Sequence, residues 1–274
     1  MTTALAAPTT DSGSAVGRVT ALARLELTML IRNKTALFNA LALGPLMVLF
    51  ISSITLQNGS TDRSSAVAFL LGSLVVFALV FAAYYNLCTT AVARREELML
   101  KRLTTGEVTK TEVLVAMAAP AFAVILAQVV LGGIAVVVLV GAPALVNPVL
   151  PVIGLLLGFV ALAVLGYATA IITRTVEAAQ ITTLLPLSVL ILLSGSTFPF
   201  AMMPEPMRMV AELTPLGAAF ELMTLGLSGT AADGTVHDLA GSFGAALLPT
   251  AVLAVWIVAG GYLVQRVMPW EPRR

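Results

Sequence analysis

Long apolar segments free of charge restrict this chain to a fold in which lipid is the solvent. A helix needs roughly 20 residues to cross about 30 Å of hydrocarbon, and six segments allow this with no acidic or basic residue in the middle. They lie near residues 35–55, 65–92, 112–140, 148–172, 179–199 and 243–266. Charged residues make up 11% of the 274 residues, whereas soluble domains carry roughly 25%. We predict an all-α polytopic membrane protein with six transmembrane helices in one domain, residues 16–274.

The residues before the first span divide into a tail and a helix. Residues 1–15 lack the charged start and apolar core of a signal peptide, and we expect a disordered tail. Residues 16–34 interleave apolar positions with Arg18, Arg24 and Arg32. That pattern is typical of an amphipathic helix at the membrane interface. The alternative is an ordinary extension of the first span.

Basic residues fall mostly on one side of the membrane when the six spans are threaded in order. That side receives Arg18, Arg24, Arg32, Lys34, Arg94, Arg95, Lys101, Arg102, Lys110, Arg174, Arg266, Arg273 and Arg274. The other side receives Arg63 and Arg208 together with six acidic residues. Because cytoplasmic loops carry an excess of Lys and Arg, we predict a multi-pass protein of the cell membrane with both termini in the cytoplasm.

The loop between the second and third predicted spans is charged and patterned. Residues 94–103 are predicted to form a short helix with an apolar ridge among charged neighbours. The ridge consists of Leu98, Met99, Leu100 and Leu103. Thr109 and Glu112 have the spacing of a capping box, which would fix the start of the third span. One interpretation is a docking element for a cytoplasmic partner, and the alternative is a solvated, positively charged loop.

The apolar stretch over residues 193–226 fails to be a single span. It breaks at Phe198-Pro199, and three further prolines cut the rest into pieces too short to cross the membrane. Non-helical backbone at membrane depth is tolerated where it is buried in protein or lines a wet cavity. We predict a re-entrant hairpin over residues 202–225, on the extracytoplasmic side between the fifth and sixth spans.

Several kinds of chemistry are missing from the sequence. No G-x-x-x-x-G-K-[ST] loop is present, so the chain is not expected to bind ATP in that way. Cys88 is the only cysteine and His237 the only histidine, and we predict no catalytic, cofactor-binding or metal site. The spans carry no ionisable relay of the kind that pumps and carriers use. Energy for uphill transport would therefore come from another subunit.

Mild polar residues inside the spans are candidates for a substrate path. We single out Tyr84, Tyr85, Asn86, Gln180 and Thr183. Hydrogen bonding between helices is the alternative role for such side chains.

Four short motifs after the fifth span resemble those of the permease subunits of type-2 ABC exporters, the ABC-2 family of drug, antibiotic and polysaccharide transporters. The motifs are Ser194-Gly195, Phe198-Pro199, Met203-Pro204 and Thr214-Pro215-Leu216. The charged loop is similar to the family's E…LKRL segment. It departs from the family at residues 106–108, Gly-Glu-Val, where a proline-containing turn is usual, and Thr214 stands where asparagine is common.

The resemblance implies a pair of permeases, this chain with a copy or a paralogue, working with two cytoplasmic ATPase subunits that bind ATP and magnesium. The coupling residues would be Glu96, Glu97, Leu100, Lys101, Arg102 and Leu103. The re-entrant gate would include Phe198, Pro199, Met203, Pro204, Pro215 and Glu221. Spans one, two and five would line the dimer interface. This chain would hold no cofactor or catalytic residue and would bind no nucleic acid.

The resemblance implies export of a lipophilic or amphipathic substrate, such as a drug, an antibiotic, a lipid or a lipid-linked glycan. Two alternatives come from other classes. An ion-coupled carrier or channel would need an intramembrane charge, to which Glu221 comes closest. A membrane enzyme or assembly scaffold would need a nucleophile, base or metal set, which the sequence lacks.

Overall fold

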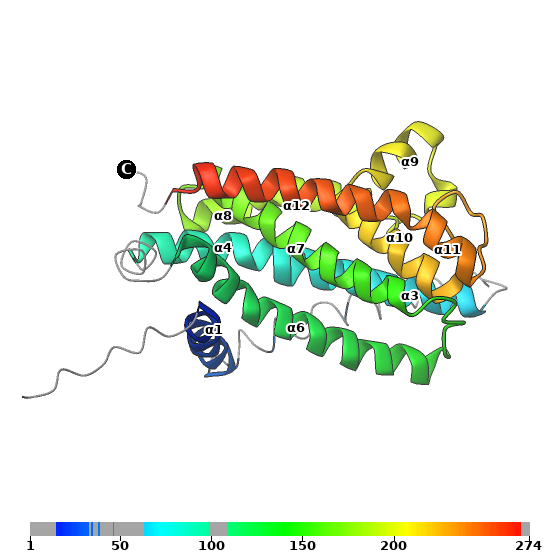
Figure 1. Ribbon diagram of the computed structural model, residues 1–274, viewed down its shortest axis with the longest axis horizontal. Coiled ribbons are helices and arrows are strands. Elements are labelled where there is room, and N and C mark those ends of the chain that lie inside the picture. The colour runs from blue at the N-terminus through cyan, green and yellow to red at the C-terminus, as the bar shows by residue number, and fades with distance from the viewer. Residues whose placement is uncertain are drawn as a thin grey trace, which may run out of the picture.

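The protein is an elongated bundle of helices in a computed structural model that describes residues 15–32, 34, 38, 46, 63–98 and 109–269 (Figure 1). Its described helices are α1 (Ala15–Arg32), α3 (Arg63–Ala78), α4 (Asn86–Glu96), α6 (Lys110–Leu139), α7 (Val149–Ile172), α8 (Val176–Leu192), α9 (Glu205–Glu212), α10 (Pro215–Ser228), α11 (Leu239–Ala245) and α12 (Leu247–Val267). A π-helix, η1 (Leu79–Tyr85), joins α3 to α4, and a 3₁₀ turn, η2 (Phe200–Met202), precedes α9. This architecture confirms the predicted all-α class.

Four described helical segments are long and apolar enough to cross a membrane. They are Arg63–Glu96, Lys110–Leu139, Val149–Ile172 and Leu239–Val267. These four coincide with the second, third, fourth and sixth predicted spans. The pair α9 and α10, bent by 92°, would make a fifth if counted as one broken span. The first predicted span, 35–55, and the tail over residues 1–14 lie outside the described residues, and α1 occupies most of the predicted interfacial helix.

The fifth predicted span, 179–199, is shorter as a helix than the apolar run suggests. Helix α8 begins at Val176 and ends at Leu192. The Ser194 hydroxyl donates to the Ile191 carbonyl at 2.7 Å, and Gly195 adopts a left-handed φ of +79°. A hydroxyl that bonds a carbonyl of the last turn competes with the helix, and glycine reverses the chain without steric cost. The segment from 193 to 199 is therefore a turn.

Helix α7 lies at the centre of the bundle, against η1, α4, α10 and α12. Glycines on α7 allow the neighbouring elements to approach its backbone closely. A Cβ added at Gly158 would lie 3.0 Å from the Ala219 side chain of α10, and one at Gly166 would lie 2.6 Å from the Tyr84 carbonyl oxygen of η1. The G-x-x-x-G spacing of Gly154 and Gly158 thus serves close packing of helices within this chain.

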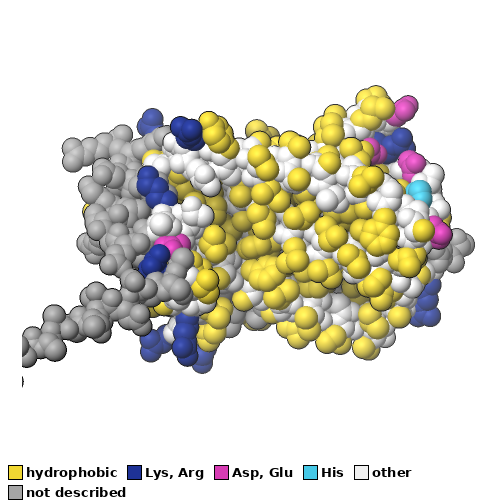
Figure 2. Space-filling model, in the orientation of Figure 1, with side chains coloured by type: hydrophobic (Ala, Val, Ile, Leu, Met, Phe, Trp, Pro, Cys, Tyr) yellow, Lys and Arg dark blue, Asp and Glu magenta, His cyan; other side chains and the backbone are white. Residues whose placement is uncertain are grey.

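The two ends of the bundle differ in charge. Figure 2 shows Lys and Arg side chains gathered at the end that carries α1, and most Asp and Glu side chains at the end that carries α9. We call these the α1 end and the α9 end. Arg18, Arg24 and Arg32 lie on α1, and Arg94 and Arg95 lie in the last turn of α4, whereas Arg208 lies on α9 and Arg63 begins α3 at the α9 end (Figure 1).

Candidate functional site

Helix α1 is joined to the last turn of α4 by an ion pair at the α1 end. The Arg94 guanidinium lies 2.7 Å from a Glu26 carboxylate oxygen, and a second Arg94 nitrogen lies 3.3 Å from Glu97. Both side chains of the Arg94–Glu26 pair are largely shielded from solvent, at 18% and 12% exposure. A pair with this geometry and limited exposure is screened less by salt than a surface pair. The pair holds α1 against the last turn of α4, where the second predicted span ends.

A second ion pair joins α1 to the first turn of α6. Arg18 lies 2.8 Å from a carboxylate oxygen of Glu112. The other Glu112 oxygen accepts the Thr109 backbone N–H at 2.8 Å, and the Thr109 hydroxyl accepts the Glu112 N–H at 3.3 Å. The predicted capping box is therefore present. Glu112 both starts α6 and ties it to α1.

The two ion pairs bracket the charged loop, because Arg94 precedes it and Glu112 follows it. We call α1, the last turn of α4 and the first turn of α6 the junction. Of the predicted coupling residues, Glu96 and Glu97 are exposed where α4 ends, and the others, Leu100, Lys101, Arg102 and Leu103, lie outside the described residues. Arg94 to Glu96 belong to the last turn of α4, so the described part of the predicted 94–103 helix continues the second span.

Arg95, the neighbour of Arg94, is buried and caps α7. Its side chain is 1% exposed. Its guanidinium donates to the carbonyls of Ala170 at 3.0 Å, Arg174 at 3.2 Å and Thr173. The last carbonyls of a helix have no partner within it, and a cation there also meets the negative end of the helix dipole. This role was not predicted from the sequence, in which Arg94 and Arg95 are neighbouring cations of one charged loop.

The predicted re-entrant hairpin consists of α9 and α10. Pro204 and Pro206 begin α9, and the Thr214 hydroxyl caps α10 by accepting the Gly217 N–H at 3.0 Å. Pro215 occupies the first helical position, where its missing N–H costs nothing. Gly229, at φ +76°, ends α10 in the left-handed conformation that glycine favours. Local sequence signals thus define both helices of the hairpin.

The elbow of the hairpin lies beside the middle of α12. The Trp256 indole donates to the Leu213 carbonyl at 2.9 Å. Trp256 is nine residues from the start of α12, or about 14 Å along a helix. From this depth α10 returns toward the α9 end, where the Leu145 N–H donates to the Leu227 carbonyl at 2.9 Å. The chain therefore enters the bundle and leaves it at the same end.

Three phenylalanines hold α10 to its surroundings. The Phe220 ring meets Phe69 of α3 and Phe200 of η2 edge-on, each with centroids 5.8 Å apart. Gly195 lies against two of these rings, and a Cβ there would be 2.7 Å from Phe200. None of these three phenylalanines was predicted from the sequence as a functional residue. Phe200 follows the Phe198-Pro199 motif directly, which was the available signal.

The predicted gate residues divide between surface and interior. Phe198 and Pro204 are exposed, Pro199 is half-buried, and Met203 and Pro215 are buried. Glu221 is also buried on α10, where one carboxylate oxygen accepts the Ala232 N–H at 3.3 Å. This contact fastens the turn after α10 to the hairpin.

The same turn is ordered by its own polar groups. The Thr235 hydroxyl and N–H donate to one Asp233 oxygen at 2.6 and 2.9 Å. These hydrogen bonds hold the pKa of the Asp233 carboxyl below its usual range, because they favour the charged form. His237 contacts the same Thr235 hydroxyl at 2.9 Å. The turn after α10 is thus a compact structure at the α9 end, held by hydrogen bonds among its own polar groups.

The predicted path residues lie on three neighbouring elements, η1, α4 and α8. Tyr84 is buried, and its hydroxyl lies 3.2 Å from the Thr169 hydroxyl of α7. Thr183 bonds the Ala179 carbonyl of its own helix at 2.6 Å. Tyr84 therefore makes a hydrogen bond between helices, which was the alternative role, whereas Thr183 bonds within its own helix. Tyr85 and Asn86 are half-buried and Gln180 is exposed, so they are the path candidates that are accessible.

Four long apolar helices and a hairpin that enters and leaves at one end define a multi-pass membrane protein. A model of the ABC-2 type transporter family matches residues 18–227. The chain belongs to this family, and it is the permease component of an ABC transporter. The family implies partner ATPase subunits. A search of curated proteins finds no match.

Proposed function

We propose that this permease exports a lipophilic or amphipathic molecule, with cytoplasmic ATPase subunits docked on residues 94–103. In this proposal the α1 end faces the cytoplasm, in keeping with its excess of basic residues. ATP and magnesium are bound by the partner subunits. A second permease, a copy or a paralogue, completes the path.

The observation that carries the proposal is the pair of ion pairs at the junction, Arg94–Glu26 and Arg18–Glu112. A loop that only connected two spans would not need to be held to α1 by these two ion pairs. Held at both ends by α1, the loop can pass a displacement to the bundle instead of absorbing it by bending. Arg95 extends the connection to α7, on which α10 packs. A continuous series of packed residues thus connects the loop to the hairpin, and a displacement of the loop can be transmitted along it.

The hairpin is the proposed gate. Helix α10 is almost wholly buried against α3, α7 and α12, while α9 projects from the bundle (Figure 1). The short segment that joins α9 to α10 can act as a hinge. Backbone rotations at a few of its residues would move the exposed α9 relative to the packed α10. The half-buried Tyr85 and Asn86 and the exposed Gln180 would offer amides and a hydroxyl to a substrate that is mainly apolar.

The coupling step is tested on the tagged permease purified with its own ATPase subunits from membranes of its source cell. Arg94→Glu places like charges together and should lower ATP hydrolysis by the complex. Arg94→Glu combined with Glu26→Arg restores opposite charges and should recover much of that activity. Arg63→Glu is the matched control, because it makes the same charge reversal at the start of α3, outside both the junction and the hairpin.

The docking surface is tested separately. Leu100→Asp and Leu103→Asp place charges on the predicted apolar ridge, and the ATPase subunits should no longer co-purify with the permease. Unchanged binding and ATP hydrolysis in both variants would contradict docking at this loop. Uptake by the chain alone in liposomes without ATP would instead support the ion-coupled alternative.

A further inference from the structure

The π-helix η1 interrupts the second predicted span near the middle of its length, and the proposed function gives it no role. The backbone on either side of η1 is ordinary α-helix. The Asn86 N–H is shared between the carbonyls of Ala83 and Phe81. Phe81 is five residues back, one more than the partner that an α-helix would use. The π-helix therefore holds one residue more than an α-helix joining the same two ends.

The local sequence does not explain this extra residue. Residues 73–96 contain neither glycine nor proline, which are frequent causes of irregular helices. Packing against α7 does explain it. A Cβ added at Gly158 of α7 would lie 3.0 Å from Leu79, and one at Gly166 would lie 2.6 Å from the Tyr84 carbonyl oxygen. Close contact with α7 thus stabilises η1 near both of its ends.

The helices on either side of η1 are fastened to different parts of the molecule. On α3, the Phe69 ring meets Phe220 of the hairpin, and a Cβ at Gly72 would lie 2.8 Å from the same Phe220 ring. On α4, Arg95 donates to carbonyls around the end of α7, and Arg94 is paired with α1. Neither helix can rotate without losing these contacts. A change in the shape of the span must therefore be taken up between them.

The residues that follow η1 can accommodate the extra residue at another position. Tyr85, Asn86, Thr89 and Thr90 are half-buried, whereas residues 72–80 on the other side are buried. The Thr89 hydroxyl donates to the carbonyls of Tyr85 at 3.1 Å and Asn86 at 2.9 Å. Hydroxyls of this kind satisfy carbonyls that an irregular membrane helix leaves free. Thr89 thus offers a donor one turn beyond η1.

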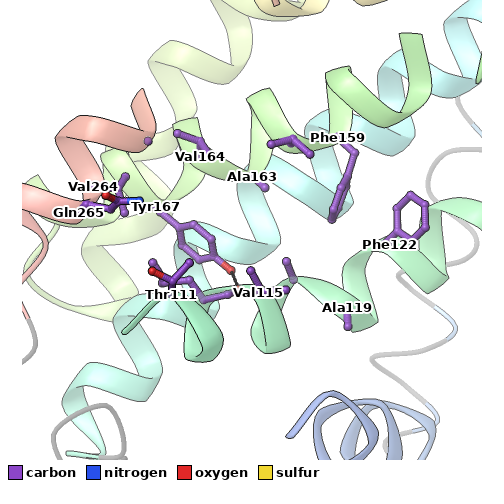
Figure 3. Close-up of a pocket in the computed structure, with 14 residues that line it drawn as sticks. Thr111, Val115, Ala119, Phe122, Phe159, Ala163, Val164, Tyr167, Val264 and Gln265 are labelled. Atoms are coloured by element: carbon purple, nitrogen blue, oxygen red, sulfur yellow. Dashed lines mark hydrogen bonds between the residues drawn. The ribbon is translucent and has the colours of Figure 1, made fainter. Parts of the chain in front are cut away.

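Helix α7 also has space on the side away from η1. Val164 lies two residues from Gly166, which places the two about 160° apart around the helix. Val164 lines a groove of about 390 Å³ between α6, α7 and α12 (Figure 3). Helix α7 can therefore shift away from η1 when the contacts of Tyr84 change.

We propose that the extra residue moves about one turn along the span, from η1 into α4, when the ATPase subunits displace the junction. This inference rests on the proposed function and adds a moving part to the proposed path. Each residue that the extra residue passes turns by up to about 100°, the rotation per residue of an α-helix, toward the place of the residue after it. Asn86 turns toward the buried place of Leu87. The half-buried amide thus leaves the path, while α3 and the last turn of α4 keep their contacts.

Deleting Ala82 tests whether η1 holds one residue too many. The deletion places Phe81 four residues before Asn86, as an α-helix requires. The permease without Ala82 should fold and melt close to the unaltered protein. Deletion of Ala161, a buried alanine within the α-helix α7, is the matched control. It should leave little folded protein, because the two halves of α7 would turn by about 100° against each other. Equal losses from the two deletions would overturn the inference.

The movement is tested by thiol labelling of the permease in complex with its ATPase subunits. On a Cys88→Ala background, Asn86→Cys is labelled with a small water-soluble reagent, either without nucleotide or with ATP and vanadate. We expect the ATP-trapped complex to lose most of the labelling. Gln180→Cys on α8 is the control and should stay labelled. When Ala82 is also deleted, Asn86→Cys should be labelled equally in both states.

The outcomes separate this inference from the proposed function. Unchanged labelling of Asn86→Cys in a complex that hydrolyses ATP would overturn the movement of the extra residue. A loss of labelling that persists without Ala82 would assign the change to a shift of the whole span, which also overturns it. A permease that binds no ATPase subunit would contradict the proposed function, and the two deletions, which need no ATP, would still test η1.

Discussion

The Trp256 indole of α12 donates a hydrogen bond to the Leu213 carbonyl, 2.9 Å away, at the elbow where α9 meets α10. This bond satisfies a carbonyl at the end of α9 that the helix itself leaves unpaired. It also connects the hairpin to a helix that crosses the membrane. Trp256 is thus a point at which movement of the proposed gate can be measured.

Trp256→Phe should keep the ring and lose this bond. We expect a loss of about 0.5–1.5 kcal/mol in stability, read as a small drop in the melting temperature of the purified permease. Tyr262→Phe, on the same helix, is the control and should change it less. Equal melting temperatures for Trp256→Phe and the unaltered protein would mean that the elbow is held by other contacts.

The neighbouring arginines 94 and 95 should respond differently to lysine. Arg95→Lys keeps the charge but cannot reach three carbonyls with one planar fork, and we expect a loss of about 2–3 kcal/mol, the range for hydrogen bonds to a charged group. Arg94→Lys can still face Glu26 and should cost less than about 1 kcal/mol. Thermal unfolding of the two variants in the same detergent checks the difference, and the reverse order would contradict the cap on α7.

Two glycines should respond oppositely to alanine. A Cβ at Gly166 would lie 2.6 Å from the Tyr84 carbonyl oxygen, a backbone atom that cannot give way cheaply. We expect Gly166→Ala to destabilise the permease by about 1–3 kcal/mol through overpacking. Gly261→Ala meets open space and should gain up to about 1 kcal/mol from helix propensity. Melting temperatures that move in the same direction would contradict the close approach of α7 to η1.

Glu221 can be tested by separating its charge from its role as acceptor. Glu221→Gln keeps an oxygen for the Ala232 N–H and should melt close to the unaltered protein. Glu221→Leu leaves that buried N–H without an acceptor and should cost about 1–3 kcal/mol. If ion coupling through Glu221 drove transport, Glu221→Gln would abolish transport while the protein stayed folded. We expect transport to persist.

Hydropathy was sufficient to predict most of the described architecture, because a charge-free run of span length has few alternatives in lipid. The all-α polytopic class and the ABC-2 resemblance are confirmed. The capping box at the start of α6 could also be predicted from the sequence, since it depends only on Thr109 and Glu112, three positions apart. The proposed coupling and gate roles remain predictions.

What the sequence did not reveal depends on contacts between distant residues. Arg94 and Arg95 look alike in the sequence, yet one faces α1 and the other enters the bundle. The meeting of Phe69, Phe200 and Phe220 requires η2 and α10 to be placed first. The end of α8 at Leu192 was missed for a different reason, because hydropathy outweighed the turn signal of Ser194 and Gly195.

The position of α1 in the chain has a consequence for how the protein is made. Helix α1 is synthesised before the partners of its two ion pairs, Arg94 following Glu26 by 68 positions and Glu112 following Arg18 by 94. At about 5–20 residues per second, these two intervals last roughly 3–14 and roughly 5–19 seconds. An amphipathic helix can wait on the membrane surface for that time. The junction can close only after the start of α6 has been made, so its closure cannot precede synthesis of the first 112 of the 274 residues.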